Sequence, residues 1–116
     1  MKYMLMFKST NVPPPGTTPC KKELPEMAQA MRELAAAGKL LWTEGLMPPS
    51  MAVRIKLDGK KAVLRDGPFA EAKEMVAGFA VVNVPTQDEA VAIAKRFLEI
   101  AQEGEAEVVP VFGHDS

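Results

Sequence analysis

The sequence predicts an α+β fold in which two helices cover one face of an antiparallel sheet. Three observations predict it. Six segments follow one another as strand, helix, strand, strand, helix and strand, a β-hairpin is inserted between the second and third strands, and the chain has only 116 residues. A chain of this length forms one domain around a single hydrophobic core. Hydrophobic residues make up 47% and charged residues 25%, which excludes a wholly disordered chain.

The first part of the chain contains a strand, a loop and a helix. Residues 2–8 include five consecutive apolar side chains, which predicts a strand that is covered on both faces. Residues 9–24 contain four of the ten prolines and indicate a long surface loop. Pro25 suits the first position of a helix, in which apolar residues recur at spacings of three and four until Gly38.

A second strand and a hairpin follow. Residues 39–46 form the second predicted strand. Residues 51–57 alternate between apolar and basic side chains, and Asp58-Gly59 is typical of a two-residue hairpin turn, because both central positions require positive φ. We therefore expect a hairpin at about residues 51–66, with a basic outer face exposed to solvent.

The last part of the chain contains a strand, a helix and a strand. Residues 77–84 are almost wholly apolar and predict a third strand that is covered on both faces. Thr86 and Glu89 form the pattern of a capping box at the start of a helix that ends near Gln102. Residues 107–112 form the last predicted strand.

Without the hairpin, this order is that of a ferredoxin-like βαββαβ sandwich. Two helices cover only one face of its sheet, whereas the strands at 3–7 and 78–84 are apolar on both sides. We expect a second copy to cover the other face, so that two sheets pack face to face in a homodimer that closes an α/β barrel. A monomer whose sheet is covered by a lipid or another partner is the alternative.

One segment resembles a known family signature. Residues 66–74 read DGPFAEAKE and resemble the DGPFAETKE signature of the YCII-related, DGPF-domain family. The opening MKYMLMF and the segments AAGKLLWTEGLMPP, AGFAVVNV and GEAEVVPVF resemble the same family in the same order. The resemblance implies a dimeric α/β barrel of ferredoxin-like subunits, and most members have no assigned reaction. Some are encoded beside, or fused to, extracytoplasmic-function sigma factors, which suggests a regulatory partner.

The sequence departs from the family pattern in two places. Ala72 replaces the threonine of the usual signature and removes a hydroxyl group. Enzymes of the wider group, including a dehydrochlorinase, use a His–Asp pair as acid and base, and carry the histidine on the first helix. The single histidine here is His114, beyond the last predicted strand, which argues against a histidine-based mechanism.

The signature turn is the strongest candidate for a catalytic site. A buried carboxylate with a raised pKa abstracts a proton, and Asp66 and Glu71 are the candidates for this role. Glu44 ends the second predicted strand and could complete a carboxylate pair with Asp66. The structural alternative is a rigid corner, because the turn itself explains the residue types of Asp66, Gly67 and Pro68.

The same turn is a candidate ligand site. Backbone amides of a tight turn together with a cation can hold an anion. The candidate ligand-binding residues are Glu44, Gly67, Pro68, Phe69 and Lys73. No spacing typical of a metal site, a phosphate loop or a nucleotide cofactor occurs, so we expect neither metal nor cofactor.

Two functions from different classes follow. The first is a dimeric small-molecule-binding or regulatory domain, with an anionic or aromatic ligand in a cleft near the signature. The second is a lyase, isomerase or dehydrochlorinase that relies on carboxylates. The net charge of −1 argues against nucleic acid, and the lack of a long apolar segment argues against membrane insertion. One cysteine points to a reducing cytoplasm.

Overall fold

The computed structural model describes residues 1–10, 24–66 and 75–113. Its strands are β1 (Lys2–Ser9), β2 (Leu40–Gly45), β3 (Val53–Asp58), β4 (Lys61–Asp66), β5 (Met75–Asn83) and β6 (Glu105–Pro110). Its helices are α1 (Pro25–Ala36) and α2 (Gln87–Ala101), with a short 3-10 helix at Pro49–Met51. The α+β prediction is therefore confirmed.

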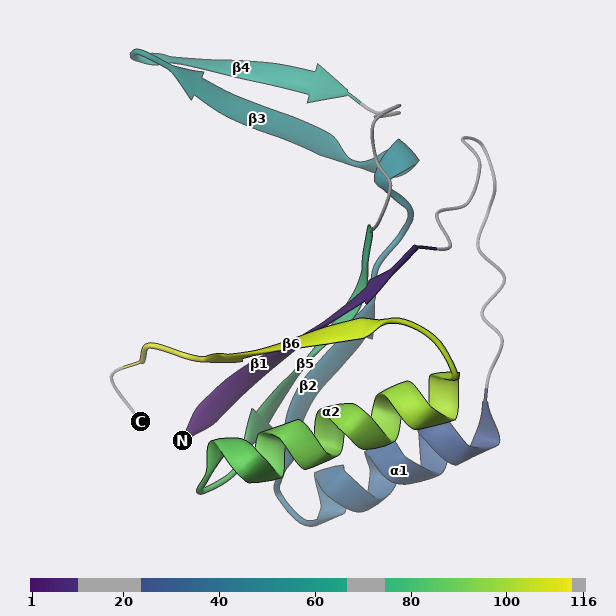
Figure 1. Ribbon diagram of the computed structural model, residues 1–116. Coiled ribbons are helices and arrows are strands. Elements are labelled where there is room, and N and C mark those ends of the chain that lie inside the picture. Colours follow the sequence, from purple (N-terminus) through teal and green to yellow (C-terminus); the bar gives the residue numbers. More distant parts are fainter. Residues whose placement is uncertain (11–23, 67–74, 114–116) are drawn as a thin grey trace.

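The main sheet is antiparallel throughout and has the strand order β2-β5-β1-β6. The two most apolar strands, β1 and β5, lie at its centre. Both helices lie on the same face of this sheet, as the ribbon in Figure 1 shows. This order and layering are those of the predicted ferredoxin-like sandwich, and β3 pairs only with β4 as a separate hairpin.

Local signals fix the ends of both helices. Pro25 occupies the first turn of α1, and Gly38 ends that helix with φ near 74°. At the start of α2, the Thr86 hydroxyl oxygen accepts a hydrogen bond of 3.3 Å from the Glu89 backbone N–H, as the capping box predicts. Such a bond satisfies one of the backbone donors that the first turn of a helix leaves unpaired.

The hydrophobic core lies between the helices and the sheet. It consists of the inward-facing residues of β1, β2 and β5 and the apolar stripe of α2, with Ala30 from α1 and Val84 after β5. Its buried members are Tyr3, Leu5, Ala30, Leu40, Ala80, Val82, Val84, Ala90, Ile93, Ala94 and Phe97.

An ion pair joins the two helices at the surface. The Arg96 guanidinium lies 3.1 Å from a Glu33 carboxylate oxygen. The hydrogen bond from Arg96 lowers the pKa of Glu33 below its ordinary value, and a second hydrogen bond from Gln29 acts in the same direction. Both groups of the pair are half-exposed, so this contact aligns the helices more than it stabilises them.

The face of the sheet opposite the helices is mainly apolar and carries no helix among the described residues, and Glu44 and Glu107 lie on this face at the two edge strands. Residues directly opposite each other in the strand pairing point to the same face, so Met4 lies with Val81 and Val109, and Met6 lies with Phe79. Trp42 stacks edge-on against Phe79 with ring centroids 5.0 Å apart and is 58% exposed. We call this surface the open face; its apolar residues are Met4, Met6, Trp42, Phe79, Val81 and Val109.

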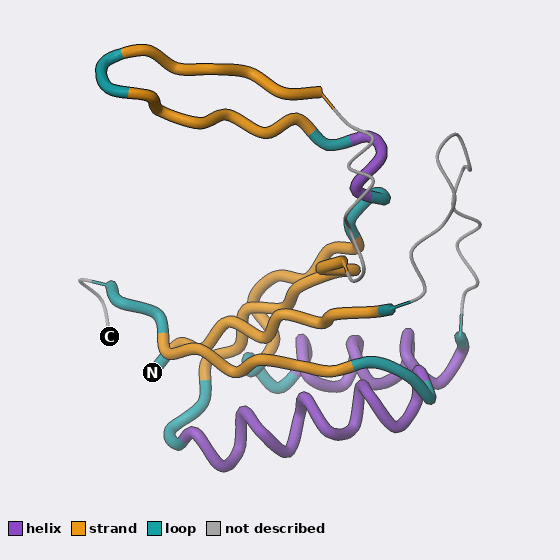
Figure 2. The backbone as a smooth tube through the Cα atoms, turned by 45° about the horizontal axis from the view of Figure 1, so that its top comes forward, coloured by secondary structure: helices purple, strands orange, loops and turns teal. Residues whose placement is uncertain are grey.

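The β3–β4 hairpin stands away from the rest of the molecule. Figure 1 and Figure 2 both show it on the side of the sheet opposite the helices. The radius of gyration is 16.1 Å, against roughly 13 Å for a compact domain of this length. Among the described residues, β3 and β4 form extensive contacts only with each other.

Several strand boundaries differ from the sequence prediction. The hairpin begins at Val53 and not at about residue 51, because Met51 belongs to the short 3-10 helix. Strand β6 begins at Glu105, before the predicted start at residue 107, and ends at Pro110. Glu105 and Ala106 pair through their backbones with Lys8 and Phe7, so a strand forms where the apolar pattern had not yet begun. Similarly, β5 begins at Met75, ahead of the predicted residue 77.

Replacing Thr86 tests the capping bond. We expect Thr86→Ala to lower the free energy of unfolding by about 1 kcal/mol, because the Glu89 N–H loses its acceptor. The matched variant Thr86→Ser keeps an acceptor and should stay within a few tenths of a kcal/mol of the wild type. Urea denaturation measures both, and equal losses would contradict the assignment.

Candidate functional site

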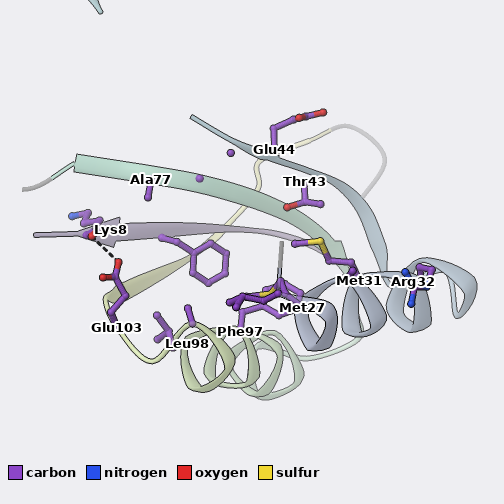
Figure 3. Close-up of a pocket in the computed structure, with 17 residues that line it drawn as sticks. Lys8, Met27, Met31, Arg32, Thr43, Glu44, Ala77, Phe97, Leu98 and Glu103 are labelled. Carbon is purple, nitrogen blue, oxygen red and sulfur yellow. Dashed lines mark hydrogen bonds between the residues drawn. The ribbon is translucent and has the colours of Figure 1, made fainter. Parts of the chain in front are cut away.

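A cavity of about 720 Å³ lies between the helices and one end of the main sheet. Figure 3 shows Met27 and Met31 from α1 and Phe97 and Leu98 from α2 along its lining. Phe7 and Phe97 approach each other with ring centroids 5.8 Å apart. The large apolar side chains that line the cavity are Phe7, Leu24, Met27, Met31, Phe97 and Leu98.

The cavity exists because two facing strand positions lack side chains. Gly45 on β2 is paired with Gly78 on β5, and alternation from Thr43 and Ala80 directs both positions towards the helices. The strands also approach closely here, since a Cβ atom on Gly78 would lie 2.9 Å from the Glu44 carbonyl oxygen. The space that two side chains would fill is therefore left open above α1.

Polar groups on the lining are already engaged within the protein. The buried Ser9 hydroxyl donates a hydrogen bond of 2.7 Å to a Glu103 carboxylate oxygen. The Thr43 hydroxyl donates to the Phe79 carbonyl oxygen at 2.9 Å. The Lys8 ammonium forms an ion pair with Glu107. These bonds hold the end of β1 and the edge strand β2 in place and leave the interior of the cavity mainly apolar.

Arg32 is the lining cation that forms no ion pair within the described part of the chain. It lies on α1, and its side chain is exposed. Figure 3 places it beyond Met31, at the periphery of the site. A guanidinium in this position can pair with a carboxylate at the outer end of a bound molecule.

The structure locates one predicted site residue fully. Glu44 borders the cavity, but its pairing with Phe79 puts its side chain on the open face. Figure 3 shows its carboxylate directed away from the other lining side chains. Asp66 is the last residue of β4, and its side chain lies outside the described residues. Whether Glu44 and Asp66 form a pair therefore stays a prediction.

The remaining candidates lie outside the described residues. They are Gly67, Pro68, Phe69, Glu71 and Lys73. In sequence, however, residues 67–74 lead directly into β5, whose residues Ala77 and Gly78 line the cavity. The signature is thus a close neighbour of the cavity along the chain.

Sequence reasoning missed most residues of the cavity. Phe97 belongs to the core and Met27 and Met31 pack against it, and all three also line the cavity, so the apolar pattern of a helix does not distinguish these two roles. The available signal was the glycine in each of two strands, because glycine inside a strand marks a place where a ligand or another backbone comes close. Gly45 and Gly78 carry that signal here.

Comparison with known proteins assigns the family. Residues 1–114 match the YCII-related domain. The chain belongs to this family. The match spans every strand and helix described above, including the hairpin and the cavity. The family resemblance of the sequence is therefore confirmed.

A relative is the uncharacterized protein R00369 of Rhizobium meliloti (strain 1021). It is 31% identical over 70 residues, which is 60% of this chain and 56% of the relative. The chain thus matches little more than half the length of that protein, whose name assigns no reaction. In the described part of the YCII-related chain, no helix has the length and apolar character needed to cross a membrane.

The glycine pair gives a matched test of how the cavity is built. We expect Gly78→Ala to lower the free energy of unfolding by roughly 1–3 kcal/mol, since its methyl group would overlap the Glu44 carbonyl oxygen. Gly45→Ala meets only Ala77 at 3.9 Å and should be neutral or stabilise by up to about 1 kcal/mol. Urea denaturation of both variants measures the difference, and the opposite ranking would contradict this geometry.

Proposed function

We propose that this YCII-related protein is a dimeric small-molecule-binding domain whose ligand occupies the cavity beside β5. The volume of the cavity, about 720 Å³, together with its mainly apolar lining carries the proposal. Ligand sites are typically concave, mainly apolar and of this size, with a few polar groups that fix orientation. The lining favours a ligand with an aromatic or other apolar body, and Arg32 suits a carboxylate at its outer end. A regulatory role in a reducing cytoplasm is part of this proposal.

Binding has more support than acid–base catalysis. A general base must reach the proton that it removes, and the Glu44 carboxylate is directed away from the cavity. The carboxylate of Glu103 accepts a hydrogen bond from Ser9 and belongs to the contact between β1 and the end of α2. Among the described side chains, no carboxylate is therefore aimed into the apolar interior.

Two probes that differ in charge test the ligand class. We expect phenylacetate to raise the melting temperature, by on the order of 10 °C at a hundred times its dissociation constant. The neutral 2-phenylethanol should bind more weakly. Arg32→Gln should raise the dissociation constant of phenylacetate about fivefold, which is a loss of about 1 kcal/mol in binding free energy, and leave the affinity for 2-phenylethanol unchanged. Calorimetric titration measures these affinities.

A cavity-filling variant provides the control. Ala28→Phe places a ring in the cavity, since Ala28 lies on its lining, and should abolish binding of both probes. Ala36→Phe adds the same ring to an exposed position of the same helix and should leave binding intact. The cavity is not the site if binding persists in Ala28→Phe, and the ligand class is wrong if neither probe binds the wild type.

The open face supports the dimer. Burying one large apolar side chain stabilises an association by about 1.5–3 kcal/mol before the costs of binding, and this face presents six apolar side chains. Sheets pack face to face at about 10 Å with interdigitated side chains. A two-fold contact lets each copy cover the other with the same surface.

Trp42 tests this interface. We expect the wild type to sediment as a dimer at micromolar concentration and Trp42→Glu to sediment as a monomer. The substitution removes a large apolar side chain from the proposed interface and adds a third negative charge to Glu44 and Glu107 on this face. Since Trp42 is exposed in the single chain, the subunit should stay folded. Ala36→Glu adds the same charge on the helical side and should remain dimeric. A monomeric wild type would refute the dimer.

A further inference from the structure

The β3–β4 hairpin, which we call the arm (residues 53–66), has two sides of opposite character. Strand pairing puts Ile55 opposite Leu64 and Leu57 opposite Ala62, and alternation adds Val53 to the same side. Ile55, Leu57 and Leu64 are 67%, 70% and 67% exposed. The other side carries Arg54 and Lys56. Large apolar side chains therefore line one whole side of a projecting ribbon and meet only solvent in the single chain.

A two-stranded ribbon of this kind needs a covering layer. An isolated hairpin is at best marginally stable in water, whereas packing of its apolar side against another surface stabilises it. Within the described residues, neither strand of the arm makes extensive contact with the sheet or the helices of its own chain. The described part of the chain therefore leaves the apolar side of the arm uncovered, and a second molecule can supply the covering surface.

The position of the arm points to a second copy of this chain. Figure 1 shows the arm on the same side of the sheet as the open face, which is the proposed dimer interface. Each arm strand has six residues and is about 20 Å long, which is twice the spacing of about 10 Å between packed sheets. An arm of this length can reach across the body of a partner that is seated on the open face.

Charge also favours the same chain as partner. The arm contains five basic and two acidic residues, a net charge of +3, whereas the whole chain carries −1. The remainder of the chain therefore carries −4. The opposite net charges of arm and body attract two copies at long range and favour their encounter, while the basic side chains of the arm face away from the contact itself. Within one copy the arm stands clear of its own body.

We infer that the apolar side of each arm packs against the body of the second copy. We call this pair of symmetric contacts, one made by each arm, the clasp. This inference rests on the proposed dimer and adds to it a second contact, separate from the open face. The side chains that carry this contact are Val53, Ile55, Leu57, Ala62 and Leu64. The basic side of the arm forms the outer surface of the clasp.

Matched cross-strand pairs test the clasp. Ile55→Thr with Leu64→Thr removes apolar surface from one side of the arm and keeps residues that favour strands. Lys56→Arg with Val63→Thr alters the facing pair on the other side and keeps its charge. In sedimentation velocity, we expect the first double variant to raise the dimer dissociation constant at least tenfold and the second to change it less than threefold. Equal effects of the two would overturn the clasp.

Hydrogen exchange in the wild type supplies a second readout. The amides of β3 and β4 should exchange slowly in the dimer and rapidly after dilution below the dissociation constant. Rapid exchange at both concentrations would overturn the clasp. So would slow exchange in a monomer, because the arm would then be covered by its own chain.

The same experiments separate the clasp from the dimer. If Trp42→Glu is monomeric and Ile55→Thr with Leu64→Thr dimerises as the wild type does, the sheet interface stands and the clasp fails. A wild type that is monomeric at all concentrations refutes both. Binding of phenylacetate is measured independently of these outcomes, since the cavity lies on the helical side of the sheet.

Discussion

The arrangement depends on one constraint, which is that two helices cover only one face of a four-stranded sheet. The central strands β1 and β5 are apolar on both sides, so half of their side chains build the core and the other half form the open face. Tyr3 and Leu5 are buried under the helices, whereas Met4 and Met6 on the same strand point the other way. The core, the open face and the cavity all follow from this alternation.

Local sequence chemistry predicted most of the fold, because each element carries its own signal. Proline at the start of α1 and threonine before α2 act within a few residues of chain. The hairpin formed as predicted, but its turn residues are Gly59 and Lys60 instead of Asp58 and Gly59. Asp58 pairs with Lys61 at the end of the ribbon, and of the two turn residues only Gly59 has positive φ. The start of β6 was misplaced because Glu105 has no apolar signal and joins the sheet through pairing with β1. The shift in strand pairing between Leu40 and Trp42, which puts Trp42 on the open face, has no signal in the sequence either.

The site was less predictable than the fold, for a physical reason. A cavity is defined by what several distant segments leave unfilled, and here it arises where Gly45 and Gly78 meet across two strands that are far apart in sequence. Each glycine alone has several explanations, and only the pairing register shows that they face each other and the helices. The signature, by contrast, is a contiguous run that the sequence alone identifies. It directed the predicted site to residues 66–74, which precede the cavity-lining residues of β5 along the chain.

The cavity and the open face lie on opposite faces of the same two strands. Phe7 points into the cavity, and the adjacent Met6 points to the open face. Because side chains alternate with a period of two, a slip of one residue in β1 would exchange these roles and expose the core. The antiparallel pairing of β1 with β5 and β6 on either side prevents such a slip. The sheet therefore keeps the cavity and the open face apart by a single layer of backbone, so the proposed ligand site and the proposed dimer interface draw on different side chains of the same strands.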